Sequence, residues 1–299
     1  MTHIANEQTP VHQTALGLRW SLRGPLAVAL RWVLYLVVLA VFLVPLWSIA
    51  ATALSRDVVR PDQLALIPRH PTLEPLRQAW KLGVARGLLN SLIVVAAGLT
   101  LQITVSALAA YALARKRFRG ATLVMVAILA TMMMPEEVIA IPLYLVLRDL
   151  KLPWAPHGLL NTYSGLVLPV VGWALPIYIL TQFMKEIPIE LEDSARIDGA
   201  GDLRIFTRVV LPLCRPALGA TAIFGFLMIW DQYLLPLLVA SNSKKTTLTV
   251  TVTNLNSSQD LPVSVRMAAA LVLLVPSLAV YLGLQRFFRH GLLTGSVKG

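Results

Sequence analysis

Residues 87–114 read GLLNSLIVVAAGLTLQITVSALAAYALA and contain no Asp, Glu, Lys or Arg. This run exceeds the roughly 20 apolar residues that a helix needs to cross the hydrocarbon core of a bilayer. Its apolar residues are continuous instead of alternating with polar ones, which argues against a strand of a membrane β-barrel. The stretch therefore predicts a transmembrane helix.

Five further runs of similar character lie before and after it. Three of them also lack Asp, Glu, Lys and Arg, at 32–54, 152–184 and 267–285. Two are interrupted by acids, 120–147 by Glu136 and Glu137, and 216–243 by Asp231. We therefore predict an all-α membrane protein with six transmembrane helices, at 27–54, 87–114, 120–147, 158–184, 216–240 and 266–288.

The composition excludes several classes of protein. Of the 299 residues, 57% are hydrophobic and 14% are charged, against about 25% charged in an ordinary soluble domain. With a mean hydropathy of +0.70, the chain cannot be a cytosolic enzyme, a disordered chain or a secreted scaffold. The net charge of +11 does not indicate nucleic-acid binding, because the basic residues flank apolar runs, where anionic lipid headgroups are the simpler partner. Cys214 is the single cysteine, so no disulfide forms within the chain.

The nature of the N-terminal segment and the orientation of the chain in the membrane are predicted from the length of the first apolar run and from the positions of the basic residues. The first apolar run is longer than the 7–15 residues of a signal-peptide core, so we expect an uncleaved anchor after a polar cytoplasmic tail at 1–26. The basic turn Arg115-Lys116-Arg117, with Arg119 and no acid, is expected to face the cytoplasm by the positive-inside rule. The tail at 289–299 and the loop at 185–215 are then expected on the cytoplasmic side as well, and the helical core extends over 87–290. The segments 55–86 and 241–265 are then extracytoplasmic connections.

The segment 185–216 differs in character from the rest of the chain, reading KEIPIELEDSARIDGAGDLRIFTRVVLPLCRP. Its acids gather near the start of a short predicted helix, where the helix dipole favours negative charge. Gly199 and Gly201 can end that helix, and Asp202 is a plausible N-cap for a second one. The segment therefore predicts a helix, a glycine turn and a second helix.

The second helix is predicted to be amphipathic. Its apolar residues recur at spacings of three and four, namely Leu203, Phe206, Val210 and Leu213. One interpretation is a helix that rests on the lipid surface. The other is a docking element for a cytoplasmic subunit, which the acids favour because anionic lipid would repel them.

The same segment resembles the EAA loop of the permeases of binding-protein-dependent ATP-binding-cassette (ABC) importers. That pattern is Glu-Ala-Ala, three residues, Gly, nine residues, Ile, one residue and Leu-Pro. It stands here as Asp193-Ser194-Ala195, Gly199, Val209 and Leu211-Pro212. Asp replaces Glu, Ser replaces Ala and Val replaces Ile. The Asp side chain is shorter than that of Glu, which bears on any salt bridge that the acid of the motif would make.

Further fragments resemble the carbohydrate-uptake branch of the family. They are Ala195-Arg196-Ile197-Asp198-Gly199-Ala200, Trp230-Asp231-Gln232-Tyr233 and the ending at 291–299. The resemblance covers about 32–299. It implies a pore of two permease chains, with two ATPase subunits below and an external solute-binding protein that delivers a sugar.

The resemblance also implies roles for individual residues. The loop forms a coupling helix that sits in a cleft of the ATPase, with Asp193 as the motif's acid and Gly199 as the turn. The coupling residues that follow from it are Glu190, Glu192, Asp193, Ser194, Ala195, Arg196, Asp198, Gly199, Ala200, Val209, Leu211 and Pro212. We expect an inner-membrane permease of a prokaryote with both termini cytoplasmic, for a sugar or, alternatively, for glycerol-3-phosphate or a polyol.

The sequence carries no signature of catalysis or of a bound cofactor. It contains no Gly-Lys pair, which a P-loop requires, so ATP and Mg²⁺ are expected on a separate ATPase chain. The histidines do not have the spacing of a metal site, namely His3, His12, His70, His157 and His290. We predict no catalytic residue, no metal and no cofactor in this chain.

Polar residues within the apolar runs are candidates for a translocation pathway. Glu136, Glu137 and Asp231 are costly in a bilayer and usually face a cavity or a partner. Their alternative roles are pairing with the partner permease, or a kink at Pro135 that brings the acids to water. The further candidates are Asn90, Trp230, Gln232 and Tyr233, of which Asn90 is equally explained as a contact between helices. A proton-coupled carrier that uses the three acids is the alternative from another class, but it leaves the acidic loop unexplained.

Overall fold

The computed structural model describes residues 25–56, 66–68, 70–240 and 244–291. Most of the predicted tail at 1–26 and of the tail at 289–299 lies outside the described residues. The described chain is helical, and its β-bridges are isolated ones, Ser55 with Pro71 and Leu152 with Ala155. It divides into two units, residues 1–47 and 48–299.

The first unit holds most of helix α1 (Pro25–Ala53). Its apolar side chains are exposed around the helix, including Trp32, Leu36 and Phe42. A helix that is apolar on all sides is typical of a membrane span, and 28–53 is long enough to be one. The helix overlaps the run at 27–54 that we expect to be the first span.

The second unit is a set of packed helices. In chain order these are α2 (Glu74–Ala79), η1 (Trp80–Val84), α3 (Ala85–Arg115), α4 (Ala121–Thr131), α5 (Glu136–Asp149), α6 (Tyr163–Val171), α7 (Ala174–Glu186), α8 (Glu190–Ile197), α9 (Asp202–Ile205), η2 (Phe206–Val210), α10 (Leu211–Leu213), α11 (Arg215–Trp230), α12 (Leu234–Ala240), α13 (Leu248–Ser257) and α14 (Val263–Gly291).

The described residues contain four helices that are long and apolar enough to cross a membrane, and up to six if each of two bent pairs is one span. One bent pair is α4 with α5, at 104°, and the other is the 202–213 helix with α11, at 78°. The predicted third span is therefore broken in its middle. Pro135 explains the break, because it disfavours the helical conformation of the residue before it.

The predicted fourth and fifth spans are also interrupted. Gly172 and Trp173 separate α6 from α7, and Trp173 has an extended backbone. Residues 231–233 separate α11 from α12. The prolines that follow these breaks, Pro176 and Pro236, lie in first helical turns, where the missing N–H leaves no hydrogen bond unmade.

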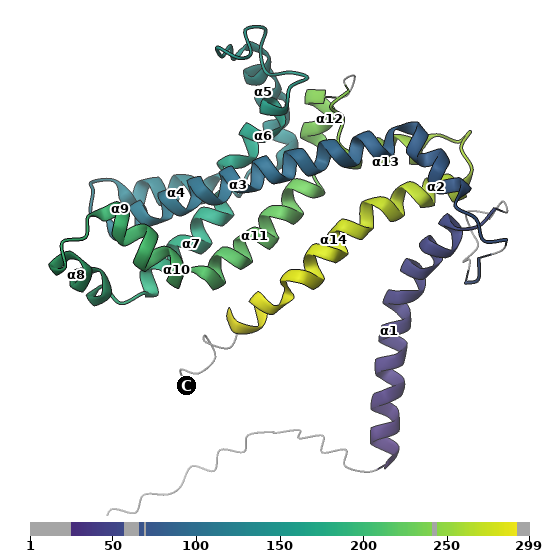
Figure 1. The fold of residues 1–299 in the computed structure, drawn as a ribbon, viewed down its shortest axis with the longest axis horizontal. Helices are drawn as coiled ribbons and strands as arrows, with labels where there is room; N and C mark the ends of the chain where they lie inside the picture. The colour runs from purple at the N-terminus through teal and green to yellow at the C-terminus, as the bar shows by residue number, and fades with distance from the viewer. Residues whose placement is uncertain (1–24, 57–65, 69, 241–243, 292–299) are drawn as a thin grey trace, which may run out of the picture. The chain divides into compact units, whose positions relative to one another are not determined.

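Helix α3 lies at the centre of the second unit and contacts α6, α7, α11 and α13. Figure 1 shows α7 and α11 running along α3, with α8 and α9 beside the C-terminal end of α3. Gly225 allows α11 to approach closely, because a Cβ there would lie 2.3 Å from Oε1 of Gln102 on α3. One apolar core surrounds the N-terminal part of α3, and a second one surrounds its C-terminal end.

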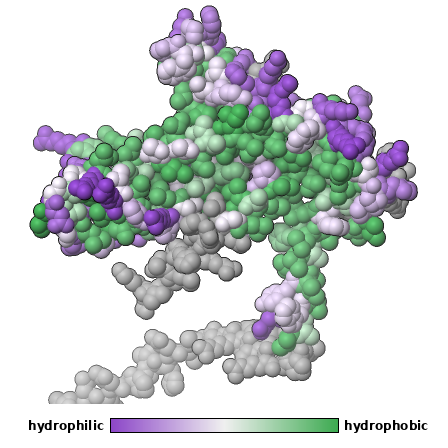
Figure 2. All heavy atoms as spheres, viewed as in Figure 1, coloured by the Kyte–Doolittle hydropathy of each residue, from purple (hydrophilic) through white to green (hydrophobic). Residues whose placement is uncertain are grey.

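Two segments that we expected to be simple connections contain helices. Residues 55–86 include α2 and η1, and residues 241–265 include α13. Leu248, Val250 and Val252 of α13 are buried, so tertiary packing stabilises a helix of β-branched residues that have low helix propensity. Figure 2 shows hydrophobic residues over the middle of the second unit and hydrophilic residues over α8 and α9.

Candidate functional site at the end of α3

The segment 185–215 forms two helices joined by a tight turn, as its sequence pattern predicts. Helix α8 ends in a Schellman motif, in which the Ala200 amide donates to the Ala195 carbonyl at 2.9 Å and the Gly199 amide donates to the Arg196 carbonyl at 3.0 Å. Gly199 has φ +78°, and a Cβ there would meet no atom within 4 Å. Glycine is therefore favoured at this turn by its backbone conformation and not by lack of space within the chain.

The acids of α8 lie in contrasting environments. Glu192 is fully buried and forms an ion pair with Arg115 of α3, with 2.8 Å between Oε1 and Nε, and the Arg115 side chain is only 7% exposed. The second oxygen of Glu192 accepts hydrogen bonds from the Tyr111 hydroxyl at 3.5 Å and from Arg196 at 3.4 Å. The neighbouring acid, Asp193, is 58% exposed. Of these two neighbouring acids, Asp193 is the one that another molecule can reach.

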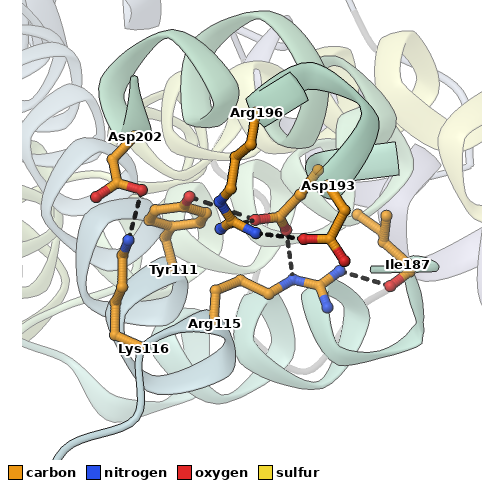
Figure 3. Close-up of polar contacts among 8 residues, drawn as sticks. Tyr111, Arg115, Lys116, Ile187, Asp193, Arg196 and Asp202 are labelled. Carbon is orange, nitrogen blue, oxygen red and sulfur yellow. Dashed lines mark hydrogen bonds and ion pairs between the residues drawn. The ribbon is translucent and has the colours of Figure 1, made fainter. Parts of the chain in front are cut away.

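Arg115 also reaches the link between α7 and α8. Its Nη2 donates a hydrogen bond to the Ile187 carbonyl at 2.6 Å. Figure 3 shows Arg115 directed at Ile187, and Arg196 directed at Asp193. The guanidinium is planar and holds its donors in fixed directions, so Arg115 fixes the last turn of α3 to this link and to α8 together.

A second ion pair joins the end of α3 to α9. Lys116 lies 2.6 Å from Asp202, and both side chains are partly exposed. The Lys116 ammonium holds the pKa of Asp202 below its ordinary value. It also lies over the Tyr111 ring, 5.6 Å from its centroid. The end of α3 therefore contacts both helices of the loop (Figure 3).

Two details of the predicted second helix were wrong. Asp202 is the first residue of α9 and makes no cap hydrogen bond, since the N-cap is Gly201; the Asp202 carboxylate pairs with Lys116 instead. The buried residues are Ile205, Phe206 and Val210, whereas Leu203 and Leu213, also predicted on the apolar face, are exposed. The π-helical turn η2 (Phe206–Val210) lies within this face, and its wider hydrogen bonding departs from the regular spacing of three and four on which the prediction rested.

Apolar side chains are exposed on both sides of the Gly199 turn. Ile197 is 88% exposed and Leu203 is 71% exposed. Both side chains are accessible to a partner, and exposed acids lie on the same two helices, Asp193 on α8 and Asp202 on α9. Of the other predicted coupling residues, Glu190, Ser194, Arg196 and Asp198 are exposed, and Ala195, Ala200, Val209, Leu211 and Pro212 are partly buried.

The predicted pathway residues divide into buried and exposed ones. Asn90 is 2% exposed; its amide donates to the carbonyls of Lys244 and Thr246 and accepts from the Tyr163 hydroxyl. Trp230 is also buried, stacks on Phe226 and donates to the Leu273 carbonyl at 3.2 Å. These contacts agree with the alternative that Asn90 joins helices.

The remaining candidates lie where the helices are interrupted. Glu136 and Glu137 are exposed in the first turn of α5, and Asp231 is exposed directly after α11. Gln232 and Tyr233 are partly buried. Among the described residues, no group of three His, Cys, Asp or Glu side chains could hold a metal ion.

Sequence reasoning missed the part of the site that α3 contributes. Arg115 and Lys116 were interpreted only as signals of orientation, and Tyr111 was not considered. The available signal was the spacing of Tyr111 and Arg115, four residues apart on one helical face, at the end of an apolar run. The acidic loop at 185–215 supplies the carboxylates that pair with the basic residues at this end of α3.

The sequence and structure were compared with those of known proteins. The family model described as binding-protein-dependent transport system inner membrane component matches residues 102–293. A diacetylchitobiose uptake system permease of Streptomyces coelicolor is 36% identical over 246 residues, which are 81% of this chain and 79% of that protein. An sn-glycerol-3-phosphate transport system permease of Yersinia enterocolitica is 34% identical over 270 residues, 87% of this chain and 94% of that protein.

A third relative and a solved structure agree with this match. An alpha-glucoside transport system permease of Rhizobium meliloti is 36% identical over 220 residues, 73% of this chain and 57% of that protein. A crystal structure of a bacterial ABC transporter involved in the import of the acidic polysaccharide alginate contains a similar chain. Its TM-score is 0.74 at 23% identity, with 90% of this chain and 99% of that chain covered, so the fold is shared.

Proposed function

The chain belongs to the family of binding-protein-dependent transport system inner membrane components, and from this premise we propose how it takes part in import. It is a permease subunit of an ABC importer for a carbohydrate or a sugar-like solute. Its relatives are membrane permease subunits and not enzymes. We propose that a separate ATPase chain binds ATP and Mg²⁺ and drives transport through the loop at 185–215.

The observation that carries this proposal is the surface around the Gly199 turn. Ile197 and Leu203 expose apolar side chains there, next to the exposed carboxylate of Asp193. Exposed apolar side chains together with exposed carboxylates suit a protein partner better than an anionic lipid surface, which would repel the acids. Asp193 would meet a basic group of the ATPase, and its present ion pair with Arg196 at 2.7 Å is exposed and easily exchanged.

The proposed assembly contains four further subunits. They are a second permease chain, two ATPase subunits and an extracytoplasmic solute-binding protein. The importer lies in the inner membrane, with both termini of this chain and the 185–215 loop on the cytoplasmic side. The basic turn at 115–119 and the inner-membrane character of the family support this orientation.

A carbohydrate is the proposed solute. Two of the relatives described above are permeases named for sugars, and one is named for glycerol-3-phosphate. The exposed acids at the helix interruptions, Glu136, Glu137 and Asp231, favour the sugar, because carboxylates accept hydrogen bonds from hydroxyls and repel a phosphate ester. A proton-coupled carrier is not supported by the relatives.

Co-purification tests the docking proposal. The chain would be expressed with its partner permease and ATPase, and Asp193→Arg would be compared with Asp260→Arg, which reverses another exposed acid. We expect only Asp193→Arg to release the ATPase while the two permeases stay together. Retention of the ATPase by Asp193→Arg, with transport intact, would contradict the proposed contact.

A second pair of variants separates the shape of the turn from its surface. Gly199→Asn keeps a residue that tolerates positive φ, whereas Gly199→Trp adds a large side chain in open space. The ATPase is expected to bind the Asn variant and not the Trp variant. Equal binding of both would place the ATPase elsewhere on the chain.

A further inference from the structure

Glu192 has no part in the proposed contact with the ATPase. Among the described residues, it is the one charged residue that is fully buried. A buried carboxylate is costly unless it is paired and hydrogen-bonded. Arg115, Tyr111 and Arg196 supply that compensation. The position of Glu192 is therefore set by groups on α3 as well as by its own helix.

Arg115 of α3 contacts two points of the chain, one on each side of the link between α7 and α8. Its Nε faces Glu192 at 2.8 Å and its Nη2 donates to the Ile187 carbonyl at 2.6 Å. Ile187 directly follows α7, and Glu192 lies in the first turn of α8. One guanidinium group thus holds α3 to both sides of the link that leads into the loop.

Apolar packing reinforces the same connection. The Tyr111 ring lies 5.1 Å from the Phe206 ring, and the core at this end of α3 includes Ile205, Val210 and Cys214 from the loop. Ile197 and Leu203 lie outside this core and are exposed. The loop thus has one side packed on α3 and another side open to a partner.

We propose that Arg115 and Glu192 are a positioning pair that transmits displacement of α8 to α3. The inference rests on the proposed function, in which the ATPase moves the loop. If α8 moves while the pair is intact, α3 moves with it, because separation would take the 2.8 Å ion pair away from two buried charges. Without the pair, α8 can shift on its covalent links to α7 and α9, and ATP is hydrolysed without movement of α3.

The test measures solute imported per ATP hydrolysed by the complete importer in proteoliposomes. Arg115→Ala, Arg115→Lys and Glu192→Gln would be compared with wild type. The matched control is Lys116→Ala, which removes the exposed ion pair from the end of α3 to α9. We expect the ratio to fall about tenfold in Arg115→Ala and Glu192→Gln, less in Arg115→Lys, and not in the control.

The amount of ATPase that co-purifies is measured in each variant and separates the two proposals. Loss of the ATPase from wild type would refute the docking proposal, whereas retained ATPase with an unchanged import ratio in Glu192→Gln would overturn the positioning pair. An equal fall in the Lys116→Ala control would also overturn it. If Arg115→Ala does not assemble, Glu192→Gln and Arg115→Lys, which preserve shape or charge, decide the outcome.

Discussion

Removal of the Glu192 carboxylate should loosen the loop far more than removal of its neighbour. In Glu192→Ala, Arg115 keeps the Ile187 carbonyl but loses its counter-ion while remaining almost buried. Breaking a buried ion pair from one side costs about 3–5 kcal/mol. Asp193→Ala removes an exposed pair, for which about 0.2–1 kcal/mol is typical.

Cys214 provides a native probe for this difference. It is the single cysteine of the chain, it is fully buried, and it lies in the same core as Ile205 and Phe206. A thiol reagent can modify it only when that core opens. At the lower figure of about 3 kcal/mol the opening equilibrium shifts about a hundredfold, whereas Asp193→Ala should change it by less than about tenfold.

The assay follows modification of the Cys214 peptide by mass spectrometry, so that cysteines of other subunits do not interfere. The detergent-solubilised chain is labelled over time with a small maleimide at constant pH. We expect Glu192→Ala to label about a hundredfold faster than wild type. Equal labelling rates in Glu192→Ala and Asp193→Ala would refute the reasoning, because burial would then not distinguish the two acids.

Three further variants test the packing around α3. Gly225→Val should lower the free energy of unfolding by about 1–3 kcal/mol, because its Cβ would lie 2.7 Å from Leu99 Cδ1 and closer still to the buried Gln102. Thermal unfolding in detergent measures this, with Gly283→Val, at a position in open space, as the control. Equal melting temperatures of the two variants would contradict the prediction. Asn90→Leu should remove the hydrogen bonds that the Asn90 amide donates to the Lys244 and Thr246 carbonyls, at a cost of about 1–3 kcal/mol. Hydrogen exchange at 244–248 should then accelerate while the solute preference of the importer stays unchanged. A changed solute preference would indicate that Asn90 belongs to the translocation pathway. Gly199→Ala should lower the stability of the turn by about 1–2 kcal/mol, because Gly199 has φ +78°, and Gly199→Asn should lower it less. Hydrogen exchange at 198–202 measures this difference. Faster exchange in the Asn variant than in the Ala variant would contradict the role of backbone conformation.

The helical fold was predictable because long continuous apolar runs favour helices that can cross a bilayer. The breaks within the long apolar runs were harder to predict. Pro135 gives a local reason for the break between α4 and α5, and a kink there was foreseen. The breaks at Gly172 and at 231–233 were not foreseen, because an apolar run has the same composition whether it forms one helix or two.

The site shows where sequence reasoning ends. Glu192 and Asp193 are adjacent acids that the helix-dipole argument treats alike. Successive residues on a helix point about 100° apart, so one carboxylate turns toward α3 and the other toward solvent. The direction depends on how the loop packs on α3, as in the contact between Phe206 of the loop and Tyr111, which are far apart in sequence. Likewise, η2 could not be foreseen from the spacing of Leu203 and Val210.

Crosslinking from the Gly199 turn tests the docking claim most directly. A photoreactive residue at Ile197, which is 88% exposed, would be irradiated in the assembled importer and compared with one at Met133, which is 86% exposed between α4 and α5. The account predicts an adduct with the ATPase from position 197 and none from position 133. An assembled importer in which position 197 yields no ATPase adduct would contradict it.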